Sequence, residues 1–147
     1  MNLIIGLCTL LLSFNTLAQE KIQKLDYQLN ARGKQTATCI SFFAAVRVVA
    51  EEKFPRLKTF SGGIGNDLPH SHRLYFSADN RKIQLKKVIP VEGRKQAMKI
   101  IDKKKSAFIS ELRKGFPKMT RTSVENWDTC ADLNMQWIKV VPIEGFY

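Results

Sequence analysis

The sequence is poor in the residues on which redox, hydrolytic and nucleotide-binding sites are built. It has only two histidines and three cysteines among 147 residues, and no two cysteines form a C-x-x-C pair. No G-x-S-x-G segment occurs, and the 13 carboxylates show no spacing typical of a glycosidase pair. The glycines at 62–65 lack the Lys-Ser/Thr of a P-loop. These absences argue against thioredoxin-like proteins, serine hydrolases, glycosidases and P-loop proteins.

The chain is also short of negative charge. Lys and Arg total 24 against 13 Asp and Glu, which gives a formal net charge of +11. Hydrophobic residues make up 44% and charged residues 25%, as in ordinary globular proteins. This composition excludes wholesale disorder, collagen-like repeats and a multi-pass membrane protein.

The first 18 residues contain no charged side chain. Residues 3–12 form an apolar run that is too short to span a bilayer as a helix but has the length of a signal-peptide core. Thr16 and Ala18 supply small residues before Gln19. We predict a signal peptide over residues 1–18 and a single exported domain over 19–147, periplasmic or secreted. Because no Lys or Arg precedes the apolar run, a buried helix or an uncleaved anchor is the alternative.

Cleavage before Gln19 would remove Cys8 and leave Cys39 and Cys130. An even cysteine count in an oxidising compartment predicts one disulfide between these two residues. Such a bridge would stabilise the fold by about 2–4 kcal/mol, mainly by restricting the unfolded chain. The alternative is two separate buried thiols.

Two helices are expected in the first part of the exported domain. Residues 19–31 have apolar positions at helical spacing and predict a short amphipathic helix that ends at the Arg-Gly step, 32–33. A second helix should open near Thr36 or Thr38 and end at the Phe-Pro step, 54–55. This second segment is apolar almost all round, which predicts a buried central helix.

The middle of the chain favours strands. Residues 59–72 predict a glycine-rich surface loop. Residues 73–77 and 81–91 alternate in polarity around a turn at 78–80, which predicts a β-hairpin. Pro90 would place the end of the second strand at a sheet edge.

The last part of the chain combines one clear helix with an uncertain segment. Residues 94–114 predict an amphipathic helix, whereas residues 120–127 and 135–143 have strand composition. A capping box from Thr122 to Glu125 offers a helix instead of the first of these strands. We therefore expect an α+β domain in which two or three helices pack on an antiparallel sheet of three to four strands.

The excess positive charge is confined to one part of the chain. Residues 81–121 contain 14 basic and 3 acidic residues, a difference of 14 − 3 = +11, which equals the net charge of the whole chain. Within the helix at 94–114, Lys95, Lys99 and Lys103 recur every four residues and share one face. The expected binding residues are Lys86, Arg94, Lys95, Lys99, Lys103 and Lys114. The alternative is a solvated face without a ligand.

This surface predicts a non-catalytic binding or accessory protein. Immunity and inhibitor proteins against exported toxins have a similar size and construction, so the protein could be of that type. The partner should be anionic: an acidic protein, a nucleic acid, a cell-wall polyanion or an anionic lipid surface. A cationic lysozyme or basic nuclease is a poor partner, because like potentials would meet. No small-molecule cofactor is expected.

Residues 70–73 carry the alternative function. On an extended chain His70 and His72 would point the same way, and with Arg73 they predict a small secreted hydrolase of phosphodiesters or cell-wall polymers. With Asp67 the same histidines are weak candidates for a metal site. Neighbours two residues apart on one strand cannot readily straddle a phosphate, so a structural or surface role is favoured.

Overall fold

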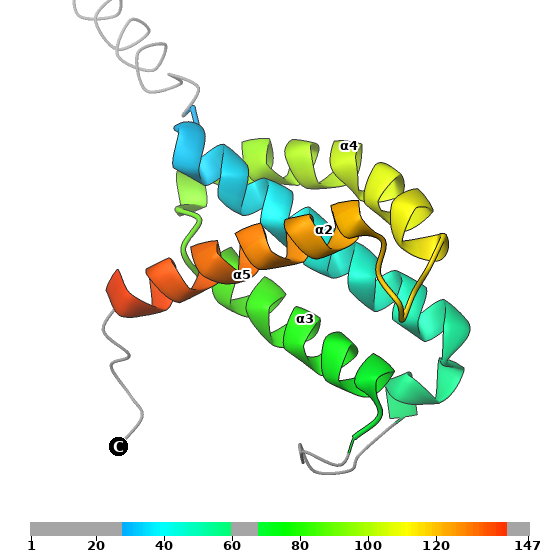
Figure 1. The fold of residues 1–147 in the computed structure, drawn as a ribbon. Coiled ribbons are helices and arrows are strands. Elements are labelled where there is room, and N and C mark those ends of the chain that lie inside the picture. The colour runs from blue at the N-terminus through cyan, green and yellow to red at the C-terminus, as the bar shows by residue number, and fades with distance from the viewer. Residues whose placement is uncertain (1–27, 60–67, 141–147) are drawn as a thin grey trace, which may run out of the picture.

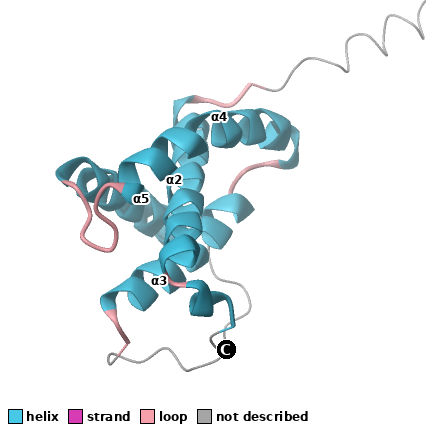
Figure 2. Cartoon of the chain, turned by 90° about the vertical axis from the view of Figure 1, so that its right-hand side faces the viewer, coloured by secondary structure: helices cyan, strands magenta, loops and turns pink. Residues whose placement is uncertain are grey.

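The computed structural model describes residues 28–59 and 68–140, and this part of the chain consists of helices joined by short loops and turns (Figures 1 and 2). The helices are α2 (Ala31–Lys53), α3 (His70–Lys87), α4 (Arg94–Arg113) and α5 (Arg121–Val140), with 3-10 turns η1 (Pro55–Thr59) and η2 (Val91–Gly93). No strand occurs in the two described ranges. The predicted α+β architecture, with a sheet of three to four strands, is therefore wrong.

Helix α2 lies at the centre of the fold, and α4 and α3 pack most extensively against it (Figure 1). Phe42, Phe43 and Val46 on this helix are at most 1% exposed. A segment that is apolar almost all round needs cover on every side, and its neighbours provide it. The prediction of a buried central helix is confirmed, as is its end, because Phe54 caps α2 and Pro55 begins η1.

The start of α2 differs from the prediction. Asn30 is the N-cap, and its side-chain oxygen accepts a hydrogen bond from the Gly33 N–H at 2.8 Å. Arg32 and Gly33 thus lie in the first turn of a helix and do not end one. The hydroxyl of Thr36 donates to the Arg32 carbonyl four residues back, so it does not cap the helix. Most of the helix expected at 19–31 lies outside the described residues.

The predicted β-hairpin is wrong, because residues 73–77, the 78–80 turn and most of 81–91 belong to α3 and the short turn that follows it. The buried residues of α3 include Leu74, Ala78 and Leu85, whose spacing follows the helical period. Alternation over the five residues 73–77 fitted a strand only because the segment was so short. No proline or glycine interrupts α3, which is flanked by Pro69 and ends before Pro90.

The two predicted C-terminal strands are also wrong, because residues 121–140 form the single helix α5. The Ser123 N–H donates to the Thr120 hydroxyl at 3.3 Å, so Thr120 is the N-cap residue that precedes the first helical residue, Arg121. The helical alternative was therefore right in type, but its cap stands two residues before Thr122. By contrast, the helix predicted at 94–114 is present as α4. It ends at Arg113, one residue earlier than predicted, and Gly115 and Pro117 follow as the expected stop signals.

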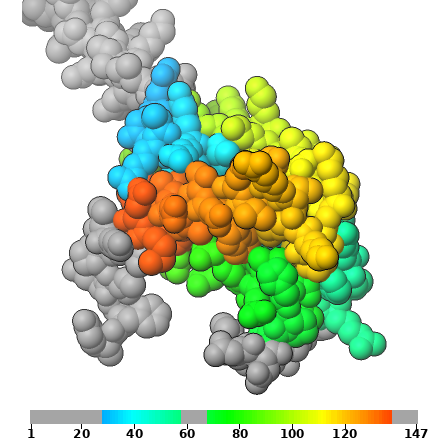
Figure 3. All heavy atoms as spheres, in the orientation of Figure 1, coloured from blue at the N-terminus to red at the C-terminus, as the bar shows by residue number. Residues whose placement is uncertain are grey.

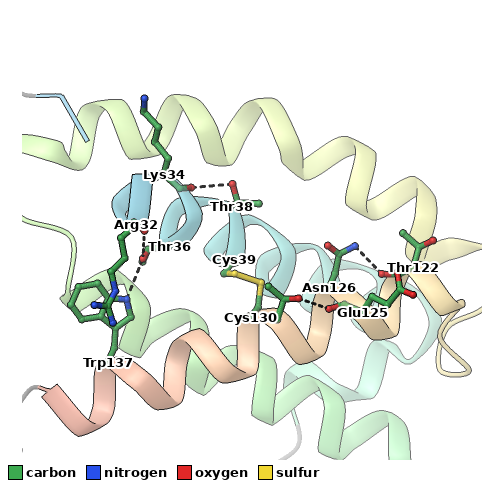
Figure 4. The surroundings of a disulfide bond; sticks show 11 residues. Arg32, Lys34, Thr36, Thr38, Cys39, Thr122, Glu125, Asn126, Cys130 and Trp137 are labelled. Carbon is green, nitrogen blue, oxygen red and sulfur yellow. Dashed lines mark hydrogen bonds between the residues drawn. A yellow bond between two sulfur atoms is a disulfide. The ribbon is translucent and has the colours of Figure 1, made fainter. Parts of the chain in front are cut away.

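The predicted disulfide is confirmed. Cys39 of α2 and Cys130 of α5 are bonded, with Cα atoms 5.2 Å apart and a sequence separation of 91 residues (Figure 4). Both residues are buried. Helix α5 crosses the face of the molecule between α4 and α3 (Figure 3). The disulfide thus joins this outer helix to the central one.

Candidate anion-binding surface

Three lysines follow one another along the solvent side of α4. Lys95, Lys99 and Lys103 are exposed, and each lies about one helical turn from the next. The opposite side of the same helix buries Ala97, Ile101 and Leu112. None of the three lysines forms an ion pair with any residue that the structure describes. We call these residues the lysine row.

Other cations of the basic segment do have carboxylate partners. Arg113 donates two hydrogen bonds to Glu52, at 2.6 and 2.9 Å, and joins the end of α4 to α2. Lys114 pairs with Glu111, and the hydrogen bonds from Lys114 and from Thr120 lower the pKa of the Glu111 carboxyl. Lys114, which was also expected to bind, directly follows α4 and is exposed, but its charge is paired with Glu111. Arg94, Lys104 and Lys105 likewise form no ion pair with a described residue, so the unpaired charge of α4 extends from Arg94 to Lys105.

Lys86 and Arg94, also predicted to bind, lie at a separate feature. They line a groove of about 450 Å³ between the end of α3 and the start of α4. Its other lining residues are Ile40, Ile83, Lys87, Ile89, Ala97, Met98 and Ile101. Ile83 lies in the segment that was expected to be a strand and Met98 in the expected amphipathic helix, and they are 45% and 48% exposed. Reading residues 70–87 as a helix would have placed Ile83 outside its buried stripe, and this is the signal that was missed.

The histidines lie in the first turn of α3 and not on an extended chain. Residues two apart on a helix point about 200° apart, so His70 and His72 do not face the same way. His70 is exposed at a hollow of about 380 Å³ that also contains Lys118 and Trp127. The Ser71 hydroxyl lies 3.3 Å from Nδ1 of His72. Arg73 is exposed on the same helix, and the expected geometry of a histidine pair is not formed.

The metal hypothesis gains no support from the described residues. They contain no group of three or more His, Cys, Asp or Glu side chains placed to hold a metal ion. Asp67, the third ligand considered, lies outside the described residues.

One polar cluster between α2 and α3 was not predicted. Asp79 accepts hydrogen bonds from Arg47, at 2.7 Å, and from Lys82. Glu51 accepts from Arg47 at 2.9 Å and from the Tyr75 hydroxyl at 3.0 Å. Asp79 had been placed in a turn between strands, so its partners could not be recognised.

The pKa values in this cluster follow from burial and pairing. Burial raises the pKa of Asp79, but Lys82 and Arg47 together lower it by more, so the net direction is downward. Burial and the hydrogen bond to Glu51 raise the pKa of Tyr75. Side chains with shifted pKa values can mark an active site, but here the shifts arise from burial and from ion pairs and hydrogen bonds that connect α2 to α3. The cluster has the chemistry of a structural ion-pair network.

The comparisons with other proteins give no further guidance. No protein-family model, curated protein or solved structure matches the chain. Within residues 28–59 and 68–140, no helix has the length and apolar character needed to cross a membrane. The surface chemistry of the chain itself therefore carries the functional interpretation.

Proposed function

We propose that this protein is an exported, non-catalytic binding protein that engages an anionic partner through the lysine row of α4. The observation that carries the proposal is the contrast along that one helix. Arg113 and Lys114 have carboxylate partners, whereas Lys95, Lys99 and Lys103 have none among the described residues. Like charges four residues apart destabilise a helix by a few tenths of a kcal/mol per pair, so the row costs stability. A ligand would offset that cost.

The geometry favours a partner with repeated negative charges. Successive lysines stand about 6 Å apart along the helix axis, which suits a nucleic acid, a cell-wall polyanion, an anionic lipid surface or an acidic protein surface. A small disulfide-bonded domain is also compatible with an immunity or inhibitor protein whose target is acidic at the contact.

Export is part of this proposal. Residues 1–18, the predicted signal peptide, lie outside the described residues. The Cys39–Cys130 disulfide supports an oxidising compartment, because such bonds persist mainly in exported proteins.

The test replaces Lys95, Lys99 and Lys103 together with Gln, which keeps helix propensity nearly constant. The matched control replaces the exposed residues Lys34, Arg73 and Lys118 with Gln and changes the net charge equally. Binding to duplex DNA, polyphosphate and phosphatidylglycerol vesicles is measured against salt. If each lysine meets one phosphate of DNA, the row variant should flatten the logarithmic salt slope by about three.

The comparison between the two variants decides the outcome. Equal losses in both would show that only net charge matters and would overturn the lysine row as the binding face. Preference for one of the three probes identifies the class of partner.

A further inference from the structure

The groove between α3 and α4 has an apolar floor and exposed apolar walls. The floor consists of Ile40 of α2 and of Ala97 and Ile101 of α4, whose exposed fractions are only 1%, 3% and 7%. Ile83 of α3 and Met98 of α4 stand above them and are about half exposed. Exposed aliphatic side chains on both sides of a hollow leave apolar surface in water that a ligand can cover.

The rim of the groove is cationic. Lys86 and Lys87 end α3, and Arg94 begins α4. Among the residues that the structure describes, no acidic residue lines the groove. Across the described part of the chain, none of these three cations forms an ion pair. The hollow therefore joins an apolar interior to an uncompensated positive edge.

We propose that this groove binds a free single-chain anionic amphiphile, such as a fatty acid, with the alkyl chain along Ile83 and Met98. The anionic head group would lie among Lys86, Lys87 and Arg94. The inference goes beyond the proposed function, because it uses the groove and none of the lysine row.

The size of the groove favours this occupant over a protein segment. A volume of about 450 Å³ lies within the range of small-molecule sites, roughly 300–1,000 Å³, which are mostly apolar with a few polar groups. Nine of the described residues line the groove, whereas each side of a stable protein interface contributes about 20–30. The positive rim selects an anionic head group over a neutral or cationic one.

The first experiment compares ligands on the full chain, below their micelle concentrations, by calorimetry. Dodecanoate should bind, and dodecyltrimethylammonium should bind at least about fivefold more weakly, because its head group meets like charge. Affinity should rise from octanoate to decanoate to dodecanoate by up to about fourfold per methylene. In protein labelled at its methionine methyl groups, the Met98 resonance should shift and that of Met135 should not.

The second experiment locates the site with matched variants. Met98→Gln should weaken dodecanoate binding about fivefold, whereas Met135→Gln, at a methionine of equal exposure on α5, should not. Arg94→Gln should weaken it up to about fivefold, and Arg73→Gln should leave it unchanged. Cooperative melting of each variant shows that the fold is intact.

The remaining outcomes separate this proposal from its rivals. Equal binding of the anionic and cationic amphiphiles, or equal losses in the control variants, would overturn it. Binding to phosphatidylglycerol vesicles without binding of monomeric dodecanoate would overturn it in favour of a membrane-surface role. Replacing the lysine row should leave dodecanoate binding unchanged, so failure here and failure of the proposed function are distinguishable.

Discussion

At the residue scale, Gly115 shows how one missing side chain shapes the turn after α4. A Cβ atom at this position would lie 2.3 Å from the carbonyl oxygen of Lys118, which is backbone and cannot move aside easily. We therefore expect Gly115→Ala to lower the free energy of unfolding by about 1–3 kcal/mol. Gly33→Ala is the control, since the three atoms nearest to its Cβ, at 3.0–3.4 Å, are side-chain atoms of Leu29 and Asn30 and not backbone, and it lies within a helix that favours Ala. Urea unfolding measures both, and equal effects would contradict the prediction.

The pairing of Asp79 predicts a pH dependence of stability. Its pKa in the folded protein lies below its ordinary value, because hydrogen bonding and charge from Lys82 and Arg47 outweigh burial. The stabilisation is thus complete above the unfolded pKa, about 3.9, and is lost as pH falls through the lower folded pKa.

We expect Asp79→Asn to destabilise the protein by about 1–2 kcal/mol at pH 7. The difference from wild type should shrink below about pH 3.9 as Asp79 itself protonates. Denaturant unfolding between pH 2 and 7 measures this, with the exposed Asp102→Asn as control. A difference that stays constant down to pH 2 would refute the pairing argument.

At the element scale, sequence patterns were reliable where periodicity and stop signals agreed. The helix at 94–114 had both, and its bounds were predicted to within one residue. In α3 a five-residue alternation outweighed a helical pattern that is visible only over its whole length. In α5 the Thr122–Glu125 capping pattern indicated a helix, but the apolar composition of the later segment, predicted as a strand at 135–143, fits a strand equally well.

The disulfide makes α5 the element that depends most on a covalent bond. This helix packs less extensively against α2 and α3 than α4 and α3 pack against α2. Its non-covalent contacts include Trp127 edge-on to Phe43 at 5.5 Å and the Trp137 indole N–H donating to Thr36 at 3.2 Å. These contacts alone hold α5 less firmly than the other helices are held.

Replacing Cys39 and Cys130 with Ala should therefore lower the free energy of unfolding by about 2–4 kcal/mol. Amide hydrogen exchange should accelerate first in α5 and last in α2, because opening follows the weakest packing. Thr129→Ala, at an exposed neighbour on α5, serves as the control. Exchange that accelerates equally in all helices would show that α5 is no weaker than the rest.

At the scale of the whole molecule, the two candidate sites differ in how far sequence could reveal them. The lysine row needed only the helical spacing of α4, so the exposure of Lys95, Lys99 and Lys103 followed from the sequence. The groove depends on where the end of α3 meets the start of α4 across Ile40. No local sequence pattern can show that these three segments come together, and the expected β-hairpin assigned the end of α3 to a strand.

The whole-molecule charge gives the last prediction. A net charge of +11 repels itself in the compact state, so monovalent salt should raise the melting temperature of wild type, and should raise that of the two triple variants less, because each has three fewer positive charges. A polyanion that binds only the folded protein adds stability through mass action, about 2.7 kcal/mol at a hundred times its dissociation constant. Polyphosphate at fixed ionic strength should therefore raise the melting temperature of wild type and of the Lys34, Arg73 and Lys118 control. It should do so much less for the variant that lacks Lys95, Lys99 and Lys103. If polyphosphate stabilises all three proteins equally, the positive charge acts as a diffuse field and α4 carries no binding face.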